Sequence, residues 1–214
     1  DTYNDQQREK LRLEQLEKEK LATELKFLKE QINPHFLFNT LNNLYSFVVN
    51  QSPIAPDIIM QLSGMLDYVL YQSQKERVPL QEELNCIENF LKLEQIRYGE
   101  RLKVDYQTDG NMSLSVAPLL LLSIVENAFK HGASGDIDEP EIRIDVQAKI
   151  KVIKCKVWNT KSLYQGELND EYKEGIGLKN IKRQLDLVYR DRYELKIKDE
   201  MDSFCVYLMI EPLK

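Results

Sequence analysis

One of the two histidines in this 214-residue chain stands in a run of polar residues that could carry out chemistry. The apolar residues of the run are spaced by four, three and four positions, at Leu37, Leu41, Leu44 and Val48. This spacing predicts a helix with one apolar face. The polar residues fall on the opposite face, at His35, Asn39, Asn42, Asn43 and Ser46. A neutral imidazole is available near pH 7, since the unperturbed pKa of histidine is about 6.5. The plainer alternative is a polar helix face that only meets water.

The apolar face of this predicted helix changes sides at Pro34. Upstream, the apolar seam from Leu21 to Ile32 would pass through His35 and Asn39 if it continued. Proline removes a backbone donor and crowds the carbonyl four residues earlier, so we expect a kink there. The kink would turn the imidazole out of the packed seam.

A second polar box lies in the other half of the chain, from Val125 to Gly132, and reads V-E-N-A-F-K-H-G. Magnesium prefers hard oxygen ligands, so an Asn127 carbonyl oxygen beside triphosphate oxygens would suit it. Lys130 and His131 can offset phosphate charge. The alternative is an ordinary helix end, where the helix dipole favours cations anyway.

A third box, G-I-G-L-K-N-I, starts at Gly175. Two glycines before a helix let the backbone approach phosphates, and the helix N-terminus supplies free N–H groups. The alternative is a simple loop-to-helix turn. The box lacks the strand-then-GxGxxG pattern of a dinucleotide fold and the Lys-Ser/Thr of a P-loop.

The elements that must position these boxes are mostly helices before residue 99 and mostly strands after it. The charged, leucine-containing residues 1–30 predict a short coiled coil, the alternative being a solvated helix with one weak apolar face. After a loop whose Asp57 can cap the next helix, apolar residues from Ile58 to Leu70 predict a second helix, and a third runs from Leu80 to Tyr98. The later segments are predicted as strands at 102–106, 142–146, 153–157, 193–197 and 204–210 and as helices at 117–130 and 177–189.

This order of elements predicts a two-domain chain of class α + α/β. The C-terminal part should be an α/β sandwich with helices on one face of a mixed sheet. The N-terminal helical hairpin is too apolar to be covered by one chain. We therefore expect a homodimer in which two hairpins form a four-helix bundle.

Composition excludes several classes of function. The net charge of -6 argues against nucleic acid as a partner. Three scattered cysteines indicate a reducing compartment rather than a disulfide framework or a zinc site. The longest apolar run, Val116 to Val125, is too short to span a bilayer, and no signal peptide is visible. Because the chain starts at Asp1, we expect a soluble fragment whose membrane contact, if any, comes through segments missing upstream.

The run Q-I-N-P-H-F-L-F-N-T-L-N-N at residues 31–43 resembles the phosphoacceptor box of the LytS/YehU-type sensor histidine kinases. The second and third boxes resemble the N and G2 boxes of the GHKL ATPases, the group that includes histidine kinases. The resemblance covers roughly residues 25–214. It implies a coiled-coil signalling helix at 1–30, dimerisation and phosphoacceptor helices with a linker helix at 31–98, and an ATP-binding catalytic domain of GHKL (Bergerat) type at 99–214.

The resemblance also implies roles for single residues. His35 would receive a phosphoryl group from ATP, and Asn39, one helical turn later, would orient the imidazole or the phosphoryl group. Glu126 would be the carboxylate near the γ-phosphate, and Asn127 would hold Mg²⁺. The other implied ATP contacts are the phosphate contacts of Lys130 and His131, the lid hinge at Gly175 and Gly177, and the phosphate-binding backbone of Gly177, Leu178 and Lys179.

The sequence departs from the family where a D-x-G-x-G box is expected, because residues 157–161 read V-W-N-T-K. The family's aspartate bonds the adenine amino group. Asn159 could accept from that group through its side-chain oxygen, as a neutral partner. Alternatively, Trp158 or Thr160 occupies the site. Residues 161–174 would form the ATP lid, which we expect to be mobile without nucleotide.

The expected function is that of the cytoplasmic core of a two-component sensor histidine kinase, at the inner face of the bacterial inner membrane in the full-length protein. It would phosphorylate His35 from ATP with Mg²⁺ and pass the group to an aspartate of a response regulator. One alternative is a dimeric scaffold with weak or no ATP binding. Another is a GHKL ATPase that hydrolyses ATP without a histidine acceptor.

Overall fold

The computed structural model describes residues 34–133, 137, 139–162 and 176–213, together with residues 7, 11, 12 and 16. The chain divides into two compact units, Asp1–Ile32 and Asn33–Lys214. Apart from those four positions, the predicted coiled coil lies outside the described residues, as does the chain just before Pro34. The coiled coil, the kink and the three-part domain division therefore stay predictions.

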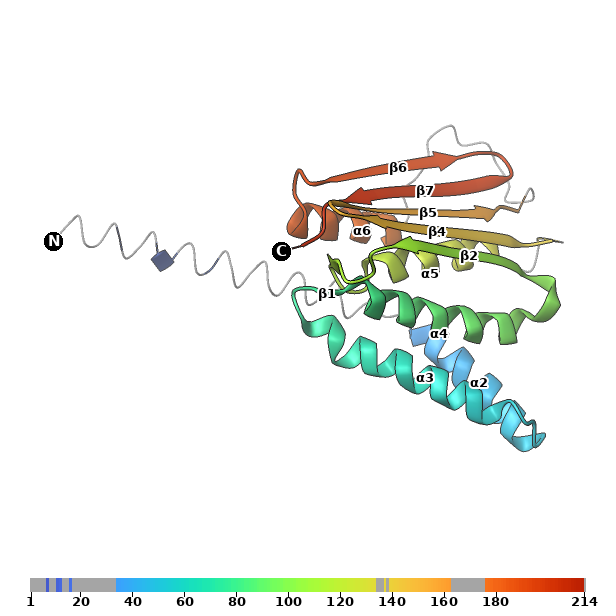
Figure 1. Cartoon of the computed structure of the whole chain (residues 1–214). Helices are drawn as coiled ribbons and strands as arrows, with labels where there is room; N and C mark the ends of the chain where they lie inside the picture. Colours follow the sequence, from blue (N-terminus) through green and yellow to red (C-terminus); the bar gives the residue numbers. More distant parts are fainter. Residues whose placement is uncertain are drawn as a thin grey trace. The chain divides into compact units, whose positions relative to one another are not determined.

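The second unit begins with a helical hairpin followed by a long third helix (Figure 1). The hairpin consists of α2 (Pro34–Val49) and α3 (Ala55–Leu70), and α4 (Leu80–Tyr98) lies against α3. Two short 3-10 turns lie nearby in the chain. The first, η1 (Gln72–Gln74), lies between α3 and α4, and the second, η2 (Gly99–Arg101), directly follows α4. Gly99 has a φ of +62°, a conformation that suits glycine at a helix end.

The apolar faces predicted for α3 and α4 are the surfaces by which these helices pack. Most of the predicted α3 face is buried, whereas Leu70 at its end is 53% exposed. The predicted capping role of Asp57 is wrong, because α3 begins two residues earlier, with Ile54 as N-cap and no side-chain cap. Asp57 instead lies in the first turn, where the helix dipole favours a carboxylate. The buried residues predicted for these two faces are Ile58, Leu62, Met65, Val69, Leu80, Leu84, Ile87 and Leu91.

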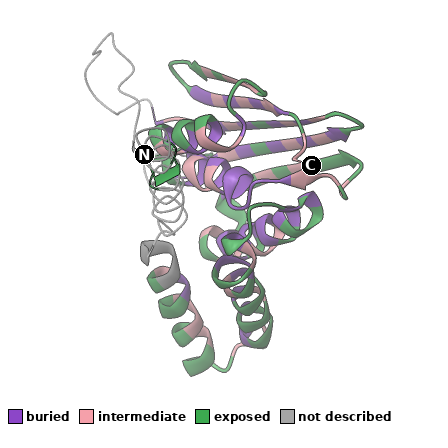
Figure 2. Ribbon diagram, turned by 90° about the vertical axis from the view of Figure 1, so that its left-hand side faces the viewer, coloured by how far each residue is buried: buried purple, intermediate pink, exposed green. Residues whose placement is uncertain are grey.

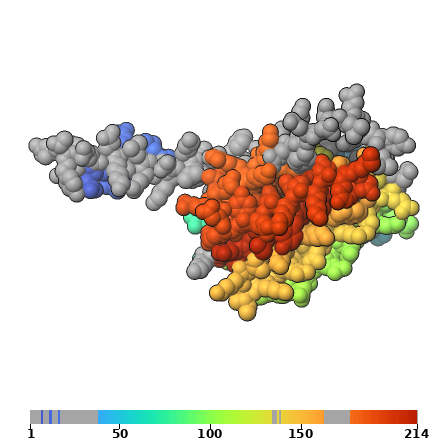
Figure 3. All heavy atoms as spheres, turned by 90° about the horizontal axis from the view of Figure 1, so that it is seen from above, coloured from blue at the N-terminus to red at the C-terminus, as the bar shows by residue number. Residues whose placement is uncertain are grey.

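A five-stranded mixed sheet follows, with helices on one face, as predicted (Figure 1). Its strand order is β2-β4-β5-β7-β6, with β2 parallel to β4 and the other neighbours antiparallel. Figure 3 views the sheet from its β6 edge, where the last strands form a continuous surface beside α6. The elements are β2 (Lys103–Gly110), α5 (Leu120–Gly132), β4 (Glu141–Lys149), β5 (Val152–Thr160), α6 (Ile176–Val188), β6 (Tyr193–Asp199) and β7 (Ser203–Ile210).

Two local features differ from the predicted elements. Helix α5 begins at Leu120 rather than at Ala117, because Leu119 has a left-handed backbone with φ of 64°. A separate two-stranded sheet pairs β1 (Val78–Pro79) with β3 (Ser115–Val116). Strands of two residues are too short to give a periodic pattern, so the sequence could not predict them.

The two faces of the sheet differ in character (Figure 2). Alternate residues of β4 and β5 are buried toward the helices, including Ile144 and Val157. The opposite face is polar, and there the Arg143 guanidinium lies 4.8 Å from the centre of the Trp158 ring. Among the described residues, no helix has both the length and the apolar character needed to cross a membrane.

Candidate functional site

Helices α5 and α6 lie against each other in the structure. A Cβ added to Gly177, at the start of α6, would lie 3.2 Å from Oδ1 of Asn127 on α5. The Asn127 oxygen therefore stands directly against backbone that has no side chain of its own. This brings together one residue of the second box and one of the third, which are far apart in the sequence.

Asn159, at the end of β5, contacts the last residue of α5. Its side chain is 1% exposed, and it lies so close to Gly132 that a Cβ on that glycine would be 2.5 Å from Cβ of Asn159. Nδ2 of Asn159 donates to the Thr160 carbonyl at 2.7 Å. This bond orients the amide and leaves Oδ1 as the acceptor end.

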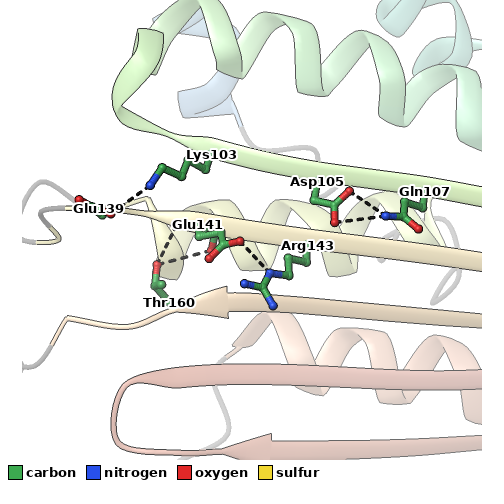
Figure 4. A network of polar contacts seen from close by, with 7 residues as sticks. All are labelled: Lys103, Asp105, Gln107, Glu139, Glu141, Arg143 and Thr160. Carbon is green, nitrogen blue, oxygen red and sulfur yellow. Dashed lines mark hydrogen bonds and ion pairs between the residues drawn. The ribbon is translucent and has the colours of Figure 1, made fainter.

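The two alternatives to Asn159 lie elsewhere on β5. Trp158 is on the polar face of the sheet with Arg143, because successive residues of a strand point to opposite faces. The hydroxyl of Thr160 accepts from the Glu141 N–H at 3.1 Å (Figure 4). The same hydroxyl donates to the Gly132 carbonyl at 3.3 Å. Of the three residues, Asn159 is the one whose side chain is buried against α5.

Basic groups gather where α5 and β5 end. Lys130 and His131 are exposed in the last turn of α5. Partial burial lowers the pKa of His131, and the charges of Lys130 and Lys161 lower it further. His131 is therefore neutral at pH 7 and can donate or accept a hydrogen bond. Lys161, whose Nζ contacts the Glu200 carbonyl at 3.0 Å, was not predicted as a site residue; its position directly after β5 was the available signal.

Glu126 has different neighbours from Asn127. Burial raises its pKa to about 7, and the negative charges of Glu94 and Glu83 on α4 contribute. Glu94 is 2% exposed; its Oε1 lies 3.4 Å from Arg97, and its Oε2 has no hydrogen-bond partner among the described residues. The charges that act on the Glu126 carboxyl thus come from α4.

Comparisons with known proteins place the chain in a family. A family model described as "Histidine kinase" matches residues 23–102. Sensor histidine kinase YpdA of Escherichia coli (strain K12) is 30% identical over 203 residues, which is 92% of this chain and 36% of that protein. The chain belongs to the sensor histidine kinase family.

Other relatives and a solved structure extend this result. Sensor histidine kinase BtsS of the same organism is 30% identical to this chain over 183 residues, which is 85% of the chain and 32% of BtsS. The chain thus spans about a third of the length of these curated relatives. The histidine kinase domain of a blue-light activated kinase, Erythrobacter litoralis EL346, has the same fold with a TM-score of 0.50 at 15% identity, over 89% of this chain and 94% of that domain.

The predicted acceptor histidine, His35, lies in the first turn of α2. The side chain of His35 lies outside the described residues, as do Gly175 and residues 163–174 of the predicted lid. Asn39 is partly buried, Leu178 is buried, and Lys179 is exposed at the start of α6. The structure thus places Glu126, Asn127, Lys130 and His131 on the later turns of α5, Asn159 at the end of β5, Gly177, Leu178 and Lys179 at the start of α6, and His35 and Asn39 on the hairpin.

The apolar stripe predicted on α2 is largely uncovered in the single chain (Figure 2). Leu41 is 44% exposed and Val48 is 52% exposed, whereas Thr40 is buried. Tyr45 and Val49 add to this exposed apolar surface. Exposed apolar surface of this kind is typical of sites that bind another protein or a membrane.

Proposed function

We propose that this chain is the catalytic core of a sensor histidine kinase that transfers the γ-phosphoryl group of ATP to a nitrogen of His35. The observation that carries the proposal is the contact between Asn127 and Gly177. It joins the two boxes that the resemblance assigns to magnesium and to phosphate. The pairing is hard to explain if both boxes are ordinary helix ends.

The residues around the proposed ATP site suit a triphosphate. Asn127 would offer Mg²⁺ a neutral hard oxygen, and its Oδ1 faces side-chain-free backbone at Gly177. Bound Mg²⁺ would neutralise part of the charge that builds up on the transferring phosphoryl group. Leu178 is buried and anchors the start of α6, while the first N–H groups of that helix have no partner within it and can bind phosphate. Lys130 adds positive charge nearby, whereas the ammonium of Lys161 is paired with the carboxylate of Asp199.

We infer that Asn159 takes the adenine-recognition role of the family's aspartate. Its nitrogen is engaged by the Thr160 carbonyl, so its oxygen is the end that would accept from the adenine amino group. A neutral acceptor makes a weaker hydrogen bond than a carboxylate does, so the adenine contact should be weaker than one made by aspartate.

In the proposed reaction an unprotonated nitrogen of His35 attacks the γ-phosphorus. A nitrogen–phosphorus bond forms, the bond to the oxygen that bridges the β- and γ-phosphates breaks, and ADP leaves. The protein contributes mainly positioning and charge neutralisation. Asn39 would orient the imidazole, and the phosphoryl group would then pass to an aspartate of a response regulator.

The kinase would act as a homodimer. The exposed apolar stripe on α2 supports a bundle in which two hairpins cover each other. Leu41 and Val48 would then lie in the interior of that bundle rather than in water.

Titration with Mg²⁺ and ATP tests the proposed site. We expect binding with a dissociation constant on the order of micromolar to low millimolar, weakened about tenfold or more by Asn127→Ala, since the metal loses a protein ligand. Asn42→Ala, which removes an exposed asparagine from α2, should leave the affinity unchanged. No binding by the parent protein would favour the scaffold function. ATP turnover that survives His35→Ala unchanged would favour an ATPase without a histidine acceptor.

A further inference from the structure

The N-terminus of α5 is capped by a carboxylate from another helix. Glu83 of α4 is fully buried. Its Oε1 accepts from the N–H groups of Leu121 and Leu122 at 2.9 and 3.0 Å, and its Oε2 accepts from that of Leu119 at 2.8 Å. These are donors that an α-helix leaves without partners at its start. The sequence of α5 supplies no cap of its own, because its N-cap residue is Leu119.

The loop that leads into α5 is also held from α6. The Ala117 N–H donates to the Tyr189 hydroxyl at 2.8 Å, and the Gln184 amide donates to the Pro118 carbonyl at 3.1 Å. Between these two residues and the helix, Leu119 adopts a left-handed backbone that is unfavourable for a leucine. The start of α5 is therefore fixed by side chains of both α4 and α6, and α5 carries Asn127 on its later turns.

The same carboxylate is bonded to the helical hairpin. The hydroxyl of Tyr68 on α3 donates to Oε2 of Glu83, the oxygen that also accepts from Leu119. Tyr68 is 3% exposed. Burial and the charge of Glu83 raise the pKa of Tyr68, so it keeps its proton and remains a donor. Burial likewise raises the pKa of Glu83, and the hydrogen bonds from Tyr68 and from the three backbone groups oppose that effect.

We propose that Glu83 is a positioning residue for the ATP site and that its hydrogen bond from Tyr68 couples the hairpin to α5. This inference rests on the proposed function for its catalytic consequence. The hairpin contributes His35, while α5 contributes Asn127. Oε2 of Glu83 thus connects the hairpin, which carries the proposed phosphoryl acceptor His35, with α5, which would hold the Mg²⁺ bound to ATP.

A coupling role for the Tyr68–Glu83 hydrogen bond predicts a different kinetic effect from a role in stability alone. Loss of stability alone would lower the phosphorylation rate and the bound fraction of ATP together, in proportion to the folded protein. Loss of coupling should lower the rate at saturating ATP while ATP affinity stays the same, because Glu83 still caps α5 and because Gln184 and Tyr189 still hold the loop that leads into α5.

The test compares Tyr68→Phe with the parent and with a matched control, Tyr193→Phe. The control also removes a tyrosine hydroxyl bonded to a carboxylate, that of Asp186 at 2.6 Å, but at an exposed position on β6. With Tyr68→Phe we expect exchange of the Leu119 amide hydrogen, followed by NMR, to quicken about tenfold relative to Ile144 in β4. We expect His35 phosphorylation at saturating ATP to slow about fivefold or more, with the dissociation constant for Mg²⁺·ATP within about twofold. Tyr193→Phe should change none of these.

Two results would overturn the proposal. One is unchanged exchange at Leu119 in Tyr68→Phe, which needs no ATP and so is independent of the proposed function. The other is a folded Tyr68→Phe protein that is phosphorylated as fast as the parent. If the parent itself is never phosphorylated while exchange at Leu119 still responds, the proposed function fails and the structural link between α3 and α5 stands.

Glu83→Gln gives a second variant. Both the phosphorylation rate and the ATP affinity of this variant should fall, because the amide places N–H donors against backbone N–H groups.

Discussion

Oδ1 of Asn127 lies 3.2 Å from the point at which a Cβ of Gly177 would stand. This distance is at the short limit for contact with a side chain, so the two positions constrain each other. The asparagine can hold its orientation because residue 177 is glycine. An oxygen held in this way, beside the free N–H groups of a helix start, is suited to a magnesium-bound phosphate.

The first prediction concerns this contact. Gly177→Ala should displace the Asn127 side chain by a few tenths of an ångström and raise the dissociation constant for Mg²⁺·ATP severalfold, while the fold stays intact. Calorimetric titration and circular dichroism measure the two quantities. Gly64→Ala is a matched control on α3, since its Cβ would also meet an asparagine amide, Nδ2 of Asn89, at 2.9 Å. If Gly177→Ala binds as tightly as Gly64→Ala does, the Asn127 orientation does not matter for ATP.

A second prediction follows from the packing of Gly132 against Asn159. A Cβ at residue 132 would lie 2.5 Å from Cβ of Asn159, a distance that no rotamer change can relieve. Gly132→Ala should therefore lower the free energy of unfolding by about 1–3 kcal/mol, as overpacked cores do. Urea denaturation measures this. Adding Asn159→Gly removes the clashing Cβ and should recover part of the lost free energy of unfolding. A double variant whose loss equals the sum of the two single losses would contradict the contact.

Glu126 gives a prediction about pH. Its pKa in the folded chain is raised to about 7 from 4.5, so the folded state binds a proton more tightly than the unfolded state does. The free energy of unfolding therefore falls as the pH rises from about 4.5 to about 7. In this range the unfolded state releases the Glu126 proton while the folded state still holds it. Glu126→Gln removes the charge, and it should raise the free energy of unfolding by about 1–3 kcal/mol at pH 8 and by little at pH 4.5. Urea denaturation at both pH values gives the difference, and an effect equal at both would contradict the raised pKa.

The uncovered stripe on α2 predicts the oligomeric state. Replacing Leu41 and Val48 by glutamate places charges in the proposed bundle interior and should convert the dimer to a monomer. Ile150→Glu changes a residue that is 88% exposed in the β4–β5 turn and should leave the dimer intact. Light scattering after size-exclusion chromatography distinguishes the two states. A dimer that survives both α2 substitutions would place the interface elsewhere.

The sequence predicted the helices and strands well because their apolar residues recur at clear periods. The alternation in β5 even assigns Asn159 and Trp158 to opposite faces of the sheet. It failed at the start of α5, where the left-handed Leu119 delays the helix by three residues. The sequence does not predict a left-handed backbone at a leucine, because this conformation is normally adopted by glycine or asparagine.

The site was predictable where it consists of short boxes and not where it depends on distant contacts. Asn127, Lys130 and Gly177 stand in recognisable runs of residues. Glu83 does not, because its partners at Leu119, Leu121 and Leu122 lie 36 to 39 residues away in the chain. A buried cap that reaches across that separation becomes visible only once the helices are packed.

Phosphorylation of His35 is the most direct test of the central claim. The parent and His35→Gln would each be incubated with γ-labelled ATP and Mg²⁺, and the acid and base stability of any protein-bound label would be measured. We predict an acid-labile, base-stable label on the parent that is absent from the variant, although His131, the only other histidine, is intact in both. Equal labelling of the two proteins, or no labelling of a folded parent dimer that binds ATP, would contradict the assignment of His35 as the phosphoryl acceptor.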